Sequence, residues 1–180
     1  LSKILLSTDG SQVPACDYND LRRYGDGLLM LSGGALSGFV GNPAGDGRAN
    51  LALQRLEILA EILPGRLYIE LQRHGLPIER ASEPHLLEYA DMLDLPLVAT
   101  NDCRFDDPSM SQPHDTLVCI GTSRKISEQD RPRYSSEHYF KTASQMSELF
   151  NDIPEAIENT LVIARRCSVM AETRAPILPA

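Results

Sequence analysis

Three polar side chains that suit divalent cations follow directly on short apolar segments of the sequence. Glu70 lies near the end of the segment RLYIEL, His74 lies just beyond it, and Asp102 follows LPLVAT. Segments of this kind are typical of strands in α/β proteins, where the residue after the strand faces a pocket. Carboxylates and imidazoles bind divalent metals, and a bound metal can activate water for phosphoester hydrolysis. The pattern therefore predicts a candidate site organised around Asp102.

Each of these residues also has a structural interpretation. Glu70 can be a surface or salt-bridged strand residue that faces away from a pocket. His74 stands before Gly75, as a turn histidine would, and Asp102 follows Asn101 as a helix cap would. The spacing alone leaves the metal site and the structural roles both open.

The other histidines are interpreted as structural. His85 falls in the first turn of a predicted helix, His114 opens another, and His138 lies in a polar segment that looks exposed. The sequence contains no HExxH motif and no nucleophile elbow. The glycine-rich segment SGGALSGFVGNPAGDG lacks the Walker and GxGxxG patterns, so a connecting loop is favoured over a phosphate cradle.

The elements that would position the candidate site alternate between strands and helices. Helical spacing of leucine and alanine predicts a helix over Arg48–Leu63, which Pro64 and Gly65 end. Ser82 is the expected cap of a second helix that runs to Leu93. The apolar segments Leu28–Leu31, Arg66–Leu71 and Leu97–Thr100 are predicted strands, the first buried on both faces. This order is the βαβ pattern of a parallel sheet or barrel.

Beyond Arg104 the sequence becomes more polar and its predicted elements are mostly helical. The expected elements are a loop over Asp106–Pro113, a short helix over His114–Gly121, a polar excursion over Glu128–Ser136 and a helix over Ser144–Phe150. Asp152 and Glu155 have the spacing of a capping box for a last helix that ends near Cys167. The final APILPA is interpreted as a linker.

Composition narrows the class of protein. The chain has 180 residues, 42% hydrophobic content and a net charge of −8, which is typical of a globular protein and argues against broad nonspecific DNA binding by this segment. Its four cysteines form no CxxC pair, which favours reduced, cytoplasmic thiols. No apolar run approaches the ~20 residues of a membrane span, and no signal pattern opens the chain. The absence of an initial methionine predicts an internal segment of a longer sequence.

Several longer motifs together resemble a known family. ELQRHG, then LPLVATNDCRF, then the run from HDTLVCIGTSRK to NTLVIARRC are similar to the PHP (polymerase and histidinol phosphatase) domain of bacterial replicative DNA polymerase III alpha subunits. SKILLS and GLLMLSGGALSG also match that pattern. The resemblance spans nearly the whole chain, and the run from His114 to Cys167 is its most specific part.

The resemblance implies a fold class and a set of site residues. The fold would be α/β, part of a distorted (β/α)7 PHP barrel followed by a helical segment. His74 and Asp102 match metal-ligand positions of the family, where zinc or manganese would bind, and Glu70 and Asn101 are further pocket candidates. The family's metal-competent pattern is Asp, any residue, His, and here Arg104 takes the place of that histidine.

The arginine has a physical consequence. A guanidinium offers only donors and stays protonated, so it cannot ligate a metal as a histidine does. Residues 102 and 104 of an extended segment point to the same side, so Arg104 would bring its charge to the pocket carboxylates in place of a metal. The family's first HxH motif is also not found in this sequence. The resemblance therefore favours a degenerate site with a structural or subunit-binding role, to which no cofactor is assigned.

The resemblance also implies a domain organisation and partners. Residues 1–105 would form a portion of the PHP barrel, 106–172 its C-terminal part with connecting helices, and 173–180 a linker toward the polymerase palm, which carries the catalytic aspartates. The partners would be the remainder of the alpha subunit, the epsilon proofreading subunit and, through the parent protein, DNA. The parent would be a DNA-directed DNA polymerase, a nucleotidyltransferase, and this segment alone inactive. The alternatives are a metal-dependent PHP phosphoesterase or 3′–5′ proofreading exonuclease, and an unrelated α/β hydrolase.

Overall fold

The computed structural model describes residues 15–170 and residue 173. Within this range the chain folds around a three-stranded parallel sheet in the order β1-β2-β3, formed by β1 (Met30–Leu31), β2 (Leu67–Leu71) and β3 (Leu97–Ala99). The predicted parallel βαβ arrangement is therefore confirmed as a mixed α/β fold with a small sheet. The expected linker over 173–180 lies outside the described residues, apart from Thr173.

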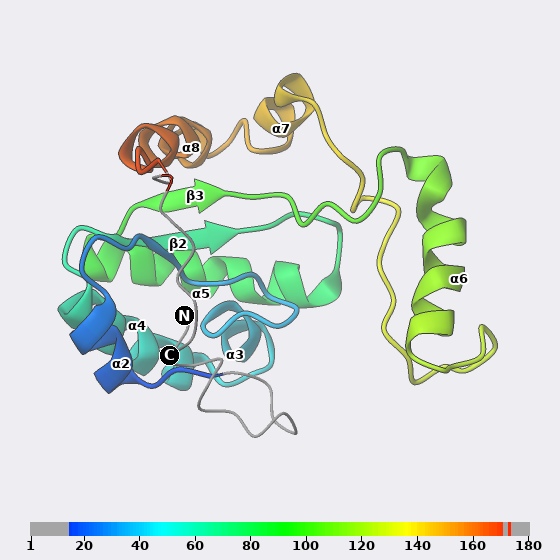
Figure 1. Ribbon diagram of the computed structural model, residues 1–180, viewed down its shortest axis with the longest axis horizontal. Coiled ribbons are helices and arrows are strands. Elements are labelled where there is room, and N and C mark those ends of the chain that lie inside the picture. The colour runs from blue at the N-terminus through cyan, green and yellow to red at the C-terminus, as the bar shows by residue number, and fades with distance from the viewer. Residues whose placement is uncertain (1–14, 171–172, 174–180) are drawn as a thin grey trace.

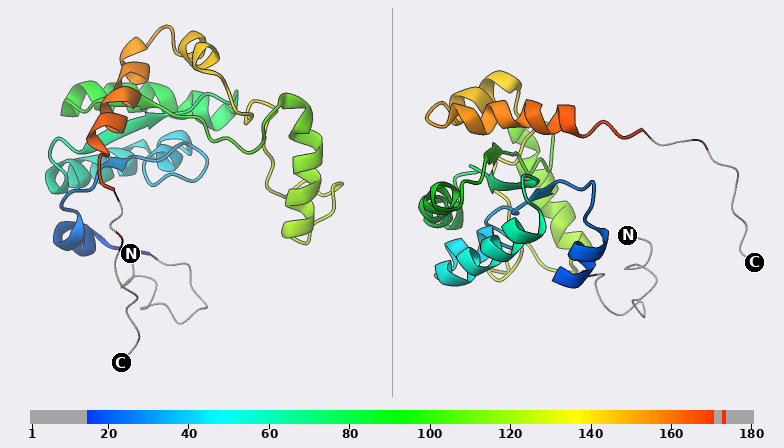
Figure 2. Two further views of the ribbon diagram at one scale, coloured as in Figure 1. Left: turned by 45° about the horizontal axis from the view of Figure 1, so that its top comes forward. Right: turned by 90° about the vertical axis from the view of Figure 1, so that its left-hand side faces the viewer.

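Helices cover both faces of the sheet. In the described part of the chain they are α2 (Tyr18–Tyr24), α3 (Gly41–Gly45), α4 (Ala49–Ile62), α5 (Pro77–Leu93), α6 (Ser111–Gly121), α7 (Ala143–Leu149), α8 (Pro154–Arg166) and the 3-10 turn η1 (Pro108–Met110). The helices α7 and α8 lie on one side of the sheet, and α3, α4 and α5 lie on the other (Figures 1 and 2). No helix among the described residues has the length and apolarity needed to cross a bilayer.

One apolar core joins these layers. Leu56 and Leu59 of α4 are fully buried, as is Ile69 of β2. From the other side of the sheet, Phe150 and Ala156 enter the same cluster, also fully buried. The leucine and alanine periodicity that predicts α4 is thus the face that this helix buries.

The helix α5 begins six residues earlier than the sequence predicts. Pro77 occupies its first turn, where a missing N–H costs nothing. The carboxylate of Glu79 accepts a hydrogen bond from the N–H of Leu76 at 3.0 Å. Ser82, the expected cap, is buried inside the helix and donates its hydroxyl to the carbonyl of Glu79. The assignment of Ser82 as the cap is therefore wrong.

Other boundaries also differ from the expectation. The strand β1 is only two residues long and half-buried, so the prediction of a strand over Leu28–Leu31 buried on both faces is wrong. The glycine-rich segment contains α3, packed on α5, and is not loop throughout. The segment predicted as loop over Asp106–Pro113 already contains η1 and the first turn of α6. The N-cap of α8 is Ile153, which makes no side-chain hydrogen bond, so the prediction that Asp152 caps this helix is wrong. Asp152 instead forms an ion pair with Arg73.

Candidate functional site

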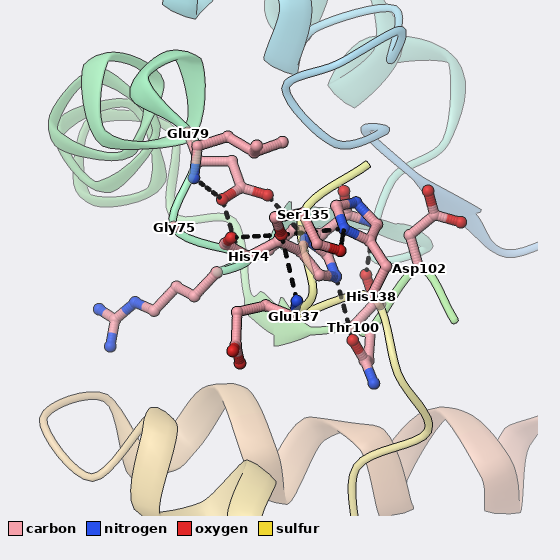
Figure 3. A network of polar contacts seen from close by, with 12 residues as sticks. His74, Gly75, Glu79, Thr100, Asp102, Ser135, Glu137 and His138 are labelled. Atoms are coloured by element: carbon pink, nitrogen blue, oxygen red, sulfur yellow. Dashed lines mark hydrogen bonds and ion pairs between the residues drawn. The ribbon is translucent and has the colours of Figure 1, made fainter. Parts of the chain in front are cut away.

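The candidate residues gather beyond the carboxyl ends of β2 and β3. His74 lies just past β2, and Thr100–Arg104 follow β3 directly. A third segment returns beside them: the N–H of Arg104 donates to the carbonyl of His138 at 2.7 Å, and Phe105 forms a parallel bridge with Tyr139. The structure thus places His74, Asp102 and His138 near one another at these strand ends (Figure 3).

His74 is held on both ring nitrogens by protein acceptors. Its side chain is only 2% exposed; Nδ1 lies 2.7 Å from Oε1 of Glu79, and Nε2 lies 3.0 Å from Oδ1 of Asn101. The amide of Asn101 is oriented by its Nδ2, which donates to the carbonyl of Tyr139 at 2.9 Å. Both ring nitrogens thus lie within hydrogen-bond distance of oxygen atoms of the protein, which occupy the positions that a metal would need.

Glu79 is the buried counterpart of His74. Its carboxylate, 4% exposed, also accepts from the backbone N–H of His74 at 2.7 Å. Burial by itself would raise the pKa of Glu79, but the hydrogen bonds from the His74 ring and from the backbone N–H groups of Leu76 and His74 outweigh it, so the pKa is lowered. An ionised carboxylate therefore fixes the turn between β2 and α5.

A second imidazole stacks on the first. The rings of His74 and His138 lie 3.9 Å apart between centroids, with 13° between their planes. His138 is fully buried, contrary to the expected exposed position, and its Nε2 has no hydrogen-bond partner among the described residues. Burial, together with the nearby His74, lowers the pKa of His138 to about 4. Ser135 donates its hydroxyl to the carbonyl of His74 at 2.8 Å and so holds this segment in place (Figure 3).

Asp102 and Arg104 pair with each other. The guanidinium of Arg104 reaches Oδ2 of Asp102 from Nη2 at 2.8 Å and from Nε at 3.2 Å, and it lies 4.7 Å from the ring of Tyr134. The two side chains lie on the same side of the extended segment, as the spacing predicts, and are 31% and 41% exposed. Arg104 therefore places its positive charge on the carboxylate that a metal would need.

Glu70 belongs to a separate hydrogen-bond network. Its carboxylate accepts from the hydroxyl of Thr100 and from the amide of Gln72, and that amide also donates to Thr100. Gln72, Asp102 and Arg104 line a polar pocket of about 240 Å³, which the glycine-rich loop closes on its other side. A larger hollow of about 610 Å³ is lined by Glu79 together with Arg73, Glu83 and Leu149.

A metal centre does not fit the side chains as they are arranged. Both nitrogens of His74 are engaged, and Asp102 is neutralised by Arg104. Among residues 15–170 and 173, no group of three or more His, Cys, Asp or Glu side chains is placed to hold a metal ion. The roles of His74 and Asp102 as ligands stay a prediction.

Sequence reasoning missed several members of this network: Glu79, Ser135, Tyr134 and His138. Only Glu79 had a local signal, because it stands three residues after Leu76 and two after a helix-starting proline. The others reach the site through the fold.

The comparisons with known proteins agree on one kind of relative. No family model matches the chain. Curated relatives include the DNA polymerase III subunit alpha of Caulobacter vibrioides, 42% identical over 166 residues, that of Pseudomonas aeruginosa, 38% identical over 155, and that of Escherichia coli strain K12, 37% identical over 180. These alignments cover 92%, 86% and 99% of this chain, but only 14%, 13% and 15% of the respective relatives. The chain is homologous over most of its length to DNA polymerase III alpha subunits, which supports its being a fragment of such a subunit.

Proposed function

We propose that the chain belongs to the PHP domain of a DNA polymerase III alpha subunit and supports the polymerase without hydrolysing substrate itself. The chain spans about one seventh of the length of the curated relatives. DNA-directed DNA synthesis is accordingly proposed for the whole subunit, with DNA bound through the parent protein. Residues 1–105 are assigned to a distorted (β/α)7 barrel portion, 106–172 to its connecting helices and 173–180 to a linker toward the palm.

One observation carries the structural role: the residues at the candidate ligand positions are used by the protein itself. The two ring nitrogens of His74 hydrogen-bond to Glu79 and Asn101, and Asp102 forms an ion pair with Arg104. Such pairs replace the charge and the coordination that a cation would supply. The network ties the strand ends to the segment around His138, which is what a supporting domain needs.

Metal analysis of the full-length subunit tests this role, with Arg104→His as the comparison. We expect no stoichiometric zinc or manganese in the unmodified protein, and no hydrolysis of a phosphoester or of a 3′ DNA end that depends on Asp102. Stoichiometric metal in the unmodified protein, lost in Asp102→Asn together with hydrolysis, would establish the competing function. That candidate, a PHP phosphoesterase or proofreading exonuclease, is favoured by the polar pocket that Asp102 lines.

A docking role toward the epsilon proofreading subunit is the second part of the proposal. It rests on the resemblance to the PHP domain of alpha subunits. The test is a pull-down of the full-length alpha subunit with epsilon, compared with an alpha subunit from which residues 1–180 are removed. Equal capture of epsilon by both forms would rule out docking on this segment.

A further inference from the structure

The helix α6 stands apart from the rest of the fold. It lies away from the sheet and from the helices that cover it, joined to them by two extended segments (Figures 1 and 2). On one side of this helix and its preceding turn, Met110, Pro113, Leu117 and Ile120 follow one another at spacings of three, four and three residues. This spacing places them on a single helical face. We call these four residues the α6 stripe.

The α6 stripe is bare. Met110, Leu117 and Ile120 are 47%, 66% and 71% exposed. A groove of about 260 Å³ lies beside the stripe; Met110, Pro113 and Leu117 line it together with Arg104, Phe105, Asp106 and His114. Apolar side chains repeated along one face are typical of a helix that packs on a neighbour, whereas single exposed ones need no explanation.

The opposite face of α6 is already packed, so the helix is held in a fixed position. Arg131, whose side chain is 4% exposed, forms an ion pair with Asp115. Cys119, one helical turn after Asp115 on the same face, is only 6% exposed. At the edge of the stripe, the ring of His114 lies 5.3 Å from that of Phe105 and 5.4 Å from that of Tyr134. The face of α6 that carries Asp115 thus packs within this chain, whereas the α6 stripe stays exposed and is available to a further contact.

We propose that the α6 stripe is the docking surface for an apolar face of the same alpha-subunit polypeptide, from a part outside residues 1–180. This rests on the proposed function. The curated relatives are about seven times longer than this chain, so most of such a subunit lies beyond it. A stripe without charged residues suits a permanent interface better than a transient one.

The small size of the stripe favours a covalently linked occupant over a separate protein. A stable complex between separate proteins usually buries more than ~1,000 Å². A surface on the same polypeptide meets the stripe at a high effective concentration and needs no such area. A second copy of the chain and a separate subunit are therefore the disfavoured occupants, and the experiment separates them.

Site-specific photo-crosslinking in the full-length alpha subunit tests the proposal. Benzoylphenylalanine replaces Ile120 in one variant and, as a control on the same helix, the exposed Gln112 in another. We expect the probe at position 120 to give an intrachain crosslink to a peptide outside residues 1–180, at least tenfold more abundant than any from position 112. Retained primer extension by the labelled subunit shows that the probe has not unfolded it.

The proposal would be overturned by crosslinks from position 120 that join two copies, that join a separate subunit or that stay within residues 1–180, and equally by the absence of any crosslink.

A second experiment tests whether the stripe stabilises α6 in the full-length protein. Leu117→Asp with Ile120→Asp is expected to speed hydrogen exchange of the α6 amides at least tenfold in the full-length protein, and Gln112→Asp less than twofold. Failure of the proposed function has a different signature: the unmodified full-length protein would then not extend a primer.

Discussion

Replacing Glu79 by alanine should have a large effect, because this carboxylate serves three donors from a buried position. It accepts from the N–H of His74, the N–H of Leu76 and the His74 ring, at 2.7, 3.0 and 2.7 Å. Hydrogen bonds to a charged group contribute ~1.5–3 kcal/mol each, so three at the lower limit give about 4.5 kcal/mol. We expect Glu79→Ala to lose about this much of the free energy of unfolding, a large share of the ~5–15 kcal/mol typical of a domain.

A second substitution separates the charge from the backbone contacts. In Glu79→Gln the amide oxygen can still accept from the two N–H groups, but the charged acceptor opposite Nδ1 of His74 is gone. We expect a loss of about 2 kcal/mol, the contribution of a single charged hydrogen bond. The exposed Glu88 on the same helix is the matched control, and Glu88→Ala should stay within ~0.5 kcal/mol of the unmodified protein.

The contribution of Glu79 to the free energy of unfolding should fall as the pH is lowered. The pKa of Glu79 is lower in the folded protein than its ordinary 4.5, so the unfolded chain takes up the proton first as the solution is acidified. The carboxylate's contribution is complete above pH 4.5 and is lost as the pH falls below it. Urea unfolding followed by circular dichroism should show the gap between the protein and Glu79→Gln shrinking below pH 4.5. A loss under 1 kcal/mol for Glu79→Ala, or a gap that does not change with pH, would refute the reasoning.

Three further predictions concern the supports of the site. Arg73, 20% exposed, pairs with Glu83 and with Asp152, so Arg73→Met should lower the free energy of unfolding in urea by about 3 kcal/mol. The control Arg80→Met, at an exposed position, should lower it by under ~0.5 kcal/mol. Equal effects of the two substitutions would contradict this reasoning. The pKa of His138 is about 4 against an ordinary 6.5, so the free energy of unfolding should fall by about 3 kcal/mol as the pH is lowered from 6.5 to 4. The variant His138→Phe should flatten this dependence of the free energy of unfolding on pH. An unchanged dependence in the variant would show that other groups cause it. Gly38→Ala would place a methyl 2.2 Å from the Gly33 carbonyl carbon, so we expect the free energy of unfolding to fall by about 2 kcal/mol and the thermal midpoint to fall with it. An unchanged midpoint would show that the loop rearranges to accept the methyl group.

Local pattern was enough for the framework of the fold but not for the network inside it. The apolar periodicity of α4 and the short β-rich segments predict the parallel order because those signals are carried by neighbouring residues. The start of α5 was misplaced because a serine competes with the Leu-Pro pair as a start signal, and the buried Glu79 decides between them. His138 looked exposed because its neighbours in sequence are polar. Its burial depends on His74, 64 positions earlier, and on ring stacking that no sequence spacing encodes.

The site was predictable in position and not in chemistry. Residues 74 and 102 follow β2 and β3, so their closeness at one sheet edge comes from the parallel order, whereas Glu70 lies within β2 and joins a separate network. What each side chain binds depends on groups from other segments. Glu79 occupies one nitrogen of His74, and Asn101, oriented by the Tyr139 carbonyl, occupies the other. The Asp102–Arg104 pair was the exception, because both partners lie in one extended segment.

The bridge between Phe105 and Tyr139 makes the intervening segment a closed excursion from the main body. The chain leaves the sheet edge and comes back to the same place, so the strands and helices on either side do not depend on the length of what lies between. The outer part of the excursion, before Tyr134, can be lengthened, shortened or rebuilt in evolution while the sheet, its covering helices and the contacts of Ser135 and His138 stay as they are. The outer surface of this segment can in this way change without redesign of the fold that carries it.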